Sequence, residues 1–353
     1  MNEGLPHRRR PRYAGKNPRR FEDKYKELAP EKYPDTIAKV LASGKTPAGS
    51  HVPVLVNEIL EILSPQAGEI AVDCTLGHGG HAGAILERIQ PGGILLGLDV
   101  DPVELPRTES RLRALGFAPE IFKTKKSNFA GLPAAMAGEG LAGADCLLAD
   151  LGVSSMQLDA PERGFSTKTP GPLDMRMDPG RGISAAQLLK KITPRVLESL
   201  LVENADESRA GILAPVLAGR DFALTTALAQ AVRAALRAYP VEDQDKSVQR
   251  VFQALRIEVN GEFSALDTLL RVLPACLKPG GRAAILTFHS GEDRRVKKAF
   301  QAGNREGAYS GIADHVTRPS PEECRANPRA TSAKLRWAVR AIAVAVRSKW
   351  DSL

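Results

Sequence analysis

Short, continuous runs of apolar residues alternate with segments of helical period over most of the chain. Five such runs, each bounded by turn residues, have the length and composition of buried parallel strands: EIAVD (69–73), GILLGLD (93–99), PEIFKT (119–124), DCLLAD (145–150) and GRAAILTF (281–288). Strands of this kind that are separated by helices predict a doubly wound α/β sheet.

The alternation stops between the fourth and fifth runs. Residues 158–247 hold several segments of helical period, one of which has Thr225 or Thr226 as its candidate N-cap, and the block is too long for one crossover. An insertion at the carboxyl edge of such a sheet overhangs the ligand crevice, so we assign it to substrate recognition. The predicted parts are a basic N-terminal extension and linker (1–50), the first part of the sheet domain (51–157), the helical insertion (158–247), the second part of the sheet domain (248–345) and a C-terminal tail (346–353).

Composition predicts a soluble, cytoplasmic protein. Hydrophobic residues make up 43% and charged residues 25% of the 353 positions, as in ordinary globular proteins. No apolar run approaches the roughly 18 residues that a membrane span needs, and no secretory signal is apparent. The four cysteines are scattered without a CxxC pair, which argues against a zinc ribbon or a disulfide framework.

Most of the positive charge lies at the N-terminus. Residues 1–20 hold seven Lys or Arg and one Glu, a net charge of +6 out of +8 for the whole chain. This Pro- and Arg-rich segment cannot bury a core, so we expect it to be disordered. Two interpretations stay open, an arm that binds nucleic-acid phosphates and a plain solubilising extension.

The segment DCTLGHGGHA (73–82) follows the first strand and opens a helix. Gly77, Gly79 and Ala82 satisfy the G-x-G-x-x-G/A pattern, in which bare backbone approaches a ligand at a helix N-terminus. Asp99 ends the second strand, where a carboxylate can accept the hydroxyls of a ribose. Together these features predict a nucleoside-containing cofactor, either NAD(H) or S-adenosylmethionine. His78 lies three residues before His81, but no HExxH pattern occurs, so we predict no metal site there.

The fourth strand leads into a highly specific pattern, DLGVSS…QLD…ERGFS…GPLDMRMD. With HVPVLVNEIL, TLGHGGHA, FQALRIEVNGE, LTFHSGEDRRVK and NPRATSAKLRWAVRA in the same order over residues 51–341, the chain resembles the bacterial RsmH (MraW) family. Its members are S-adenosylmethionine-dependent methyltransferases that act on a cytosine N4 amine in small-subunit ribosomal RNA. The resemblance implies a Rossmann-like class I methyltransferase sheet, S-adenosylmethionine as cofactor and 16S rRNA, in its decoding region, as substrate. It leaves a monomer and a homodimer both open.

The resemblance also assigns roles to individual residues. Those implied in cofactor binding are Gly79, Gly80, His81, Asp99, Phe129, Asp150 and Gln157. Position, just after the fourth and fifth strands, makes Asp150, Ser154, Ser155 and His289 the candidates for catalysis, with a structural loop as the alternative for His289. Asp150 ends the fourth strand, where its carboxylate can bind either the ammonium group of the cofactor or the target amine. We favour the cofactor contact, with Ser154 and Ser155 orienting the target.

Several basic residues are candidates for RNA contacts. Arg163 and Arg176 can meet RNA phosphates or form internal ion pairs with Asp174 or Asp178, and the DRRVKK run (293–298) adds positive surface. Departures from the family pattern concern the target side more than the cofactor: Pro170 replaces an Asp, NADE (204–207) replaces GEE, Gly291 replaces an apolar residue and Val339 stands where Glu is common.

Two other functions compete with methyl transfer. An NAD-dependent dehydrogenase accounts for the glycine loop and Asp99 but leaves the GPLDMRMD pattern and the helical insertion without a role. A non-catalytic ribosome-assembly factor that retains a cofactor pocket accounts for both, and the departures from the family pattern are compatible with it.

Overall fold

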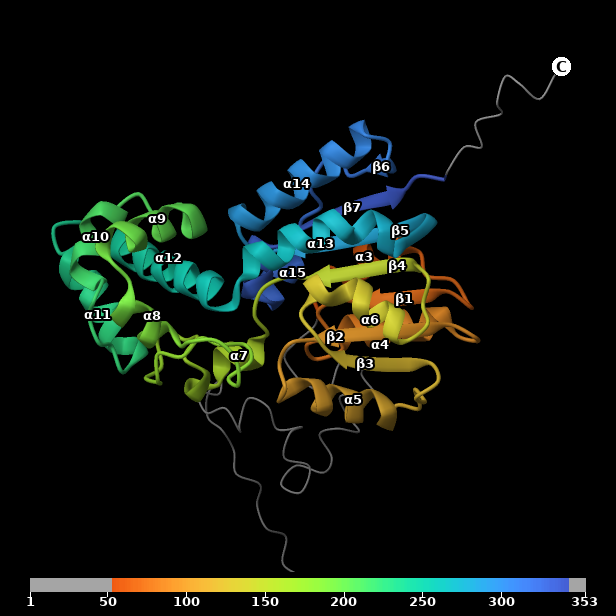
Figure 1. Ribbon diagram of the computed structural model, residues 1–353, viewed down its shortest axis with the longest axis horizontal. Coiled ribbons are helices and arrows are strands. Elements are labelled where there is room, and N and C mark those ends of the chain that lie inside the picture. The colour runs from red at the N-terminus through yellow and green to blue at the C-terminus, as the bar shows by residue number, and fades with distance from the viewer. Residues whose placement is uncertain (1–52, 343–353) are drawn as a thin grey trace, which may run out of the picture. The chain divides into compact units, whose positions relative to one another are not determined.

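The computed structural model describes residues 53–342, in which seven strands form one sheet of order β3-β2-β1-β4-β5-β7-β6 (Figure 1). The strands are β1 (Ile70–Asp73), β2 (Ile94–Asp99), β3 (Phe122–Lys126), β4 (Ala144–Asp150), β5 (Leu277–Thr287), β6 (Tyr309–Ile312) and β7 (Lys334–Arg340). Neighbours among β1 to β5 are parallel, while β7 is antiparallel to both β5 and β6. All five predicted strands are present, so the doubly wound α/β sheet is confirmed.

Helices cover both faces of the sheet. One face packs against α6 (Leu132–Gly138), α13 (Glu262–Cys276) and α14 (Ser290–Arg305), through residues such as Val72 and Leu147. The other packs against α3 (Val56–Leu63), α4 (Gly80–Ile89) and α5 (Glu104–Ala114), through Ala71 and Leu148. Successive strand residues serve opposite cores, which explains why these strands are apolar throughout.

A second hydrophobic core lies among the helices between β4 and β5. It is built by α8 (Ala185–Lys191), α9 (Pro194–Ala205), α10 (Ala210–Leu217), α11 (Thr225–Ala235) and α12 (Val241–Asn260). The predicted helical block is therefore present, and α12 runs without a break across residue 247 and is followed directly by α13. The chain reaches this core through α7 (Ser155–Asp159), the turn Pro161–Arg163 and an irregular stretch up to residue 184.

Two glycines of that irregular stretch are required by close backbone packing. A Cβ on Gly171 would overlap the carbonyl oxygen of Pro161, and one on Gly164 would overlap that of Pro172. Gly164 also has a φ of 75°, which disfavours other residues. The segments ERGFS (162–166) and GPLD (171–174) are therefore packed closely against each other.

Two details differ from the sequence-based expectations. Strands β6 and β7 were not predicted. The N-cap of α11 is Leu224, not a threonine, because the Thr225 hydroxyl instead donates to the carbonyl of Thr169 at 3.0 Å. No helix among residues 53–342 is long and apolar enough to cross a membrane. The N-terminal basic segment and the C-terminal tail lie outside the described residues.

Candidate active site

Three aspartates are the last residues of neighbouring strands, at the carboxyl edge of the sheet. Asp73 ends β1, Asp99 ends β2 and Asp150 ends β4. Because β2, β1 and β4 are adjacent and parallel, their carboxyl ends lie side by side (Figure 1). The structure therefore brings together Asp99 and Asp150, which the sequence analysis selected, and adds Asp73, which it did not.

The glycine loop connects β1 to α4 and is held in place by α5. Gly77 and Gly79 have φ values of 46° and 75°, in the region that favours glycine. A Cβ on Gly79 would lie 2.7 Å from the Thr108 Cγ2 atom, and the Thr108 hydroxyl donates to the carbonyl oxygen of Gly77. The first N–H groups of α4, which begins at Gly80, have no partner within the helix and can serve a polar ligand.

The Asp99 carboxylate joins this loop to the end of β2. It accepts hydrogen bonds from the backbone N–H of Gly77 at 2.7 Å and of Asp101 at 2.9 Å. Burial raises the pKa of Asp99 to about 6, against the lowering effect of these hydrogen bonds. Burial likewise raises the pKa of Asp73 to about 6. Both carboxyl groups titrate close to neutral pH, as groups in ligand sites often do.

His81 faces Asp150 across the site. Its Nε2 atom lies 3.4 Å from the Asp150 Oδ2 atom, and His81 is buried. Within residues 53–342, neither His81 Nδ1 nor Asp150 Oδ1 has a hydrogen-bond partner, although both atoms are buried. Buried polar atoms are rarely left without partners, so this pair fits a polar ligand between the glycine loop and β4.

The segment after β4 is fixed by a capping box. The Ser154 hydroxyl accepts the N–H of Gln157 at 3.2 Å, and the Gln157 side-chain oxygen accepts the N–H of Ser154 at 3.0 Å. The Ser154 side chain thus caps α7. Ser155 begins α7, but its side chain lies outside the described part of the structure.

Asp101 is a buried junction that the sequence analysis missed. Its Oδ2 atom accepts hydrogen bonds from Gln157 Nε2 and from an Arg163 guanidinium nitrogen, each at 2.8 Å. Arg163 also donates to the carbonyl oxygen of Met177 at 2.8 Å. Arg163 therefore forms an internal ion pair, but with neither of the two partners expected for it.

Arg176 forms the internal ion pair that was one of its two expected roles. Its guanidinium binds both carboxylate oxygens of Asp174, at 2.7 and 2.8 Å. Asp178, the other candidate partner, instead pairs with Lys126 of β3 at 2.9 Å. Arg163 and Arg176 therefore both use their guanidinium groups in internal ion pairs.

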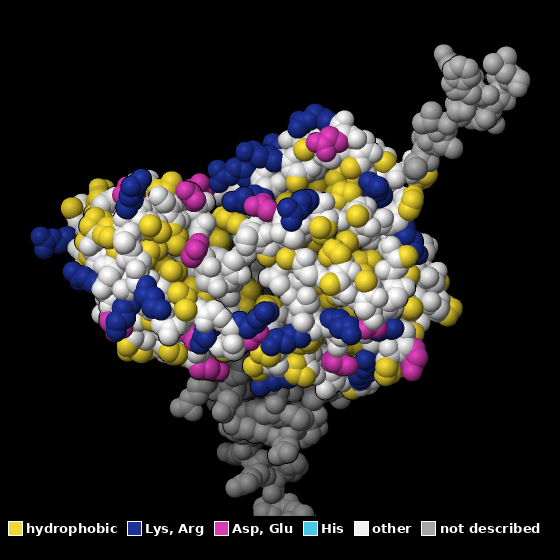
Figure 2. Space-filling view, viewed as in Figure 1, with side chains coloured by type: hydrophobic (Ala, Val, Ile, Leu, Met, Phe, Trp, Pro, Cys, Tyr) yellow, Lys and Arg dark blue, Asp and Glu magenta, His cyan; other side chains and the backbone are white. Residues whose placement is uncertain are grey.

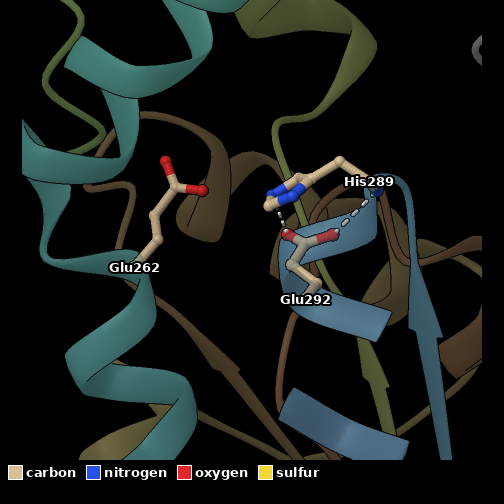
Figure 3. Close-up of side chains that lie close together, drawn as sticks. All are labelled: Glu262, His289 and Glu292. Atoms are coloured by element: carbon tan, nitrogen blue, oxygen red, sulfur yellow. Dashed lines mark hydrogen bonds and ion pairs between the residues drawn. The ribbon is translucent and has the colours of Figure 1, made fainter. Parts of the chain in front are cut away.

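His289 follows β5 and belongs to a separate group of charges (Figure 3). Its Nε2 atom lies 3.2 Å from Oε1 of the buried Glu292, and Glu262 is the third member, with ligand atoms within 4.8 Å of one another. Burial raises the pKa of Glu292, but the hydrogen bond and charge of His289 hold it below its usual value.

The same group has the residue types of a metal site, but its charges are already compensated. Arg256 binds both oxygens of Glu262, each at 2.8 Å. A second cation beside this guanidinium would be repelled. The group is therefore an ion-pair network that fixes His289 and leaves its buried Nδ1 atom without a hydrogen-bond partner among residues 53–342.

Phe129 lies just beyond the end of β3, in the single turn Phe129–Gly131. The side chain of Asn128 accepts the N–H of Ala130 at 2.9 Å and so fixes this turn. The ring is partly buried against the core beneath α6 and α13. Since β3 pairs with β2 and Lys126 is opposite Asp99, the turn lies near the strand end that carries Asp99.

Comparison with known proteins decides the family. Residues 48–341 match the MraW methylase family. The chain belongs to this family. It is 48% identical to ribosomal RNA small subunit methyltransferase H 1 of Lachnoclostridium phytofermentans, an alignment that covers 96% of this chain and 95% of that protein. It is 51% identical to ribosomal RNA small subunit methyltransferase H 2 of Alkaliphilus metalliredigens, with coverage of 94% and 97%. The resemblance read from the sequence is confirmed.

One departure from the MraW family pattern has a structural explanation. A Cβ on Gly291 would lie 2.6 Å from the Phe263 Cζ atom of α13. The Arg295 guanidinium lies over this ring at 4.1 Å from its centroid. Phe263 thus occupies the space beside Gly291, and a larger side chain at position 291 would require this ring to move.

Proposed function

We propose that this protein transfers a methyl group from S-adenosylmethionine to the N4 amine of a cytosine in small-subunit rRNA, in its decoding region. The observation that carries the proposal is the pair formed by the buried His81 and the partly buried Asp150, which lies between the glycine loop and β4 in a chain of the MraW methylase family. We place the reaction in the cytoplasm.

The residues at the strand ends fit the cofactor. Asp99 can accept the ribose hydroxyls, while the loop that includes Gly79, Gly80 and His81 lets the backbone approach closely. Phe129 provides an apolar surface for the adenine. Gln157 closes the pocket after β4, in an orientation set by Asp101. The aspartates favour a cationic ligand, because their negative charges lie close together in a buried place.

Methyl transfer requires positioning and one proton acceptor. When bound, S-adenosylmethionine would supply an electrophilic methyl group on a sulfonium, and the electron pair of the broken C–S bond would stay on sulfur as N4 bonds to the methyl carbon. Asp150 holds the amine or the cofactor ammonium through its Oδ1 atom, which has no other partner among residues 53–342. When Asp150 holds the amine, its carboxylate accepts the proton released from N4; when it holds the cofactor ammonium, that proton passes to water. In both cases His81 lies 3.4 Å from the carboxylate and orients it.

The target base needs groups that orient it. His289 Nδ1 is available for this purpose on the β5 side of the site, and the backbone around Ser154 and Ser155 lies on the β4 side. We assign these residues to target orientation. The Ser154 hydroxyl already accepts one backbone hydrogen bond, so its O–H donor and its second lone pair remain for the target.

The function is tested on small ribosomal subunits from cells that lack this gene. The purified full chain and labelled S-adenosylmethionine are added, and the modified nucleosides are mapped by mass spectrometry. We expect a new N4-methylcytidine at one position. Cofactor binding without any methyl transfer would favour the assembly-factor function instead. A thermal shift with NADH but not with S-adenosylhomocysteine would favour the dehydrogenase.

Cofactor affinity should depend on the ionisation of Asp99. Its pKa of about 6 means that the carboxylate form, which accepts ribose hydroxyls best, predominates only above that pH. We expect the Kd for S-adenosylhomocysteine to be constant above pH 7 and to rise below pH 6, approaching tenfold per pH unit for a single protonation. Isothermal titration calorimetry between pH 5 and 8 measures this.

The variant Asp99→Asn distinguishes the effect of Asp99 ionisation from that of the neighbouring carboxyl groups. The variant should bind more weakly at all pH values and lose the dependence, whereas Asp73→Asn should keep it, because Asp73 has its own raised pKa but does not bond the Gly77 N–H. A constant Kd from pH 5 to 8 in the unaltered protein would contradict the assignment of Asp99.

A further inference from the structure

Helix α14 has a strongly basic outer surface. Its exposed residues between positions 294 and 305 are all basic or amides: Arg294, Lys297, Lys298, Gln301, Asn304 and Arg305. Figure 2 shows Lys and Arg side chains in a row over the place where Figure 1 has α14. We call Arg294, Lys297, Lys298 and Arg305 the basic face of α14.

The acidic residues of α14 are kept away from this face. Glu292 and Asp293 both lie in the first turn, where Glu292 is buried against His289. Asp293 pairs with Arg336 at 2.6 Å and with Lys334 at 3.3 Å. Signs of charge are usually interspersed on protein surfaces, so this separation within one helix is informative.

The cations of the basic face are largely uncompensated. Lys297, Lys298 and Arg305 form no ion pair with any other residue in the range 53–342. Arg294 pairs with Asp206 at 2.8 Å, but both side chains are about half exposed. Such an exposed pair contributes little stability, so a phosphate group can readily take the place of Asp206.

The position of α14 connects this face to the site. The helix starts at Ser290, directly after His289 and the carboxyl end of β5. Residues three and four positions apart share one side of a helix, so Arg294, Lys298 and Arg305 form a stripe that leads away from the site. An RNA strand with its target base near His289 can therefore lay its backbone along α14.

We infer that the basic face of α14 binds the phosphate backbone of the RNA that carries the target cytosine. The inference rests on the proposed function for the identity of the RNA. Phosphate contacts of this kind give affinity and orientation without reading sequence. Lys and Arg serve equally as phosphate partners in such a contact, so charge matters more than the side-chain type.

The test compares two double variants of the full chain that lose the same charge. Lys297→Ala/Lys298→Ala removes two cations from the basic face. Arg88→Ala/Arg325→Ala removes two exposed cations from α4 and α15 (Pro321–Ala326); α4 covers the opposite face of the sheet. Binding to a small-subunit rRNA transcript is measured between 50 and 200 mM salt, and S-adenosylhomocysteine binding is measured in parallel.

We expect Lys297→Ala/Lys298→Ala to raise the Kd for RNA roughly tenfold or more near 0.1 M salt. The slope of the logarithm of the association constant against the logarithm of the salt concentration should become shallower by about 1.4 to 1.8, which corresponds to two lost phosphate contacts. S-adenosylhomocysteine binding should not change, and Lys297→Arg/Lys298→Arg should bind RNA as the unaltered protein does.

An unchanged Kd and slope would overturn the inference, and so would an equal loss in Arg88→Ala/Arg325→Ala, which would reflect net charge alone. If α14 instead binds an acidic protein, RNA binding stays unchanged and the inference fails. The RNA titration measures binding and does not require methyl transfer. If the proposed function is wrong, the separate assay reveals it, because the unaltered protein then transfers no methyl group.

Discussion

Asp150→Ala should lower methyl transfer by about 10²- to 10⁴-fold. The carboxylate lies at the end of β4 with one oxygen 3.4 Å from His81 and the other buried without a hydrogen-bond partner among residues 53–342. Removal of a preorganised charge or of a proton acceptor typically has effects of this size. Single-turnover kinetics with saturating S-adenosylmethionine and small subunits measure the loss.

The two roles that remain for Asp150 give different results in binding measurements. If it holds the cofactor ammonium, Asp150→Ala also raises the Kd for S-adenosylhomocysteine. If it accepts the proton from the target amine, that Kd stays the same and only the rate constant falls. A variant with both a normal rate and a normal Kd would contradict the placement of Asp150 in the site.

Asp145 provides a matched control on the same strand. It lies at the opposite end of β4, where it accepts the N–H of Ile70 at 2.8 Å and pairs with Lys278 at 2.6 Å. Asp145→Ala removes a carboxylate from the same strand but leaves the aspartates at the carboxyl ends of the strands in place. We expect it to lower the thermal midpoint while the rate per folded molecule stays close to that of the unaltered protein.

The central strands were predictable because burial on both faces leaves a continuous apolar run. The same reasoning misses β6 and β7. Tyr309–Ile312 is only four residues long, and Lys334–Arg340 mixes basic with apolar residues, with four of its seven positions only partly buried. These two strands lie at one margin of the sheet, where apolar patterning is weak.

The candidate site was predictable from sequence where a carboxylate stands at the end of a strand. Asp99 and Asp150 each interrupt an apolar run, and Asp73 gives the same signal at the start of the glycine loop. Asp101 gives no such signal, because its importance depends on Gln157 and Arg163, which are 56 and 62 positions away. A side chain's partner at this separation follows from tertiary packing and cannot be inferred from spacing.

Arg163→Ala should destabilise the protein by about 3–5 kcal/mol. The side chain of Arg163 is 11% exposed and that of Asp101 only 1%, so the change leaves a buried carboxylate without its counter-charge. It also removes the donor to the carbonyl oxygens of Arg176 and Met177, which belong to the tight segment before α8. Urea unfolding followed by circular dichroism measures the change.

Arg176→Ala is the control for an ion pair of similar geometry but greater exposure. The side chains of Arg176 and Asp174 are 22% and 26% exposed, and exposed pairs contribute about 0–1 kcal/mol. Equal destabilisation by the two variants would refute the special role of the Asp101 junction. Asp101→Leu/Arg163→Met should recover much of the stability lost in Arg163→Ala, because no buried charge is left unpaired. Cofactor affinity should be lower in this double variant than in the unaltered protein, since Gln157 loses the carboxylate that orients its amide.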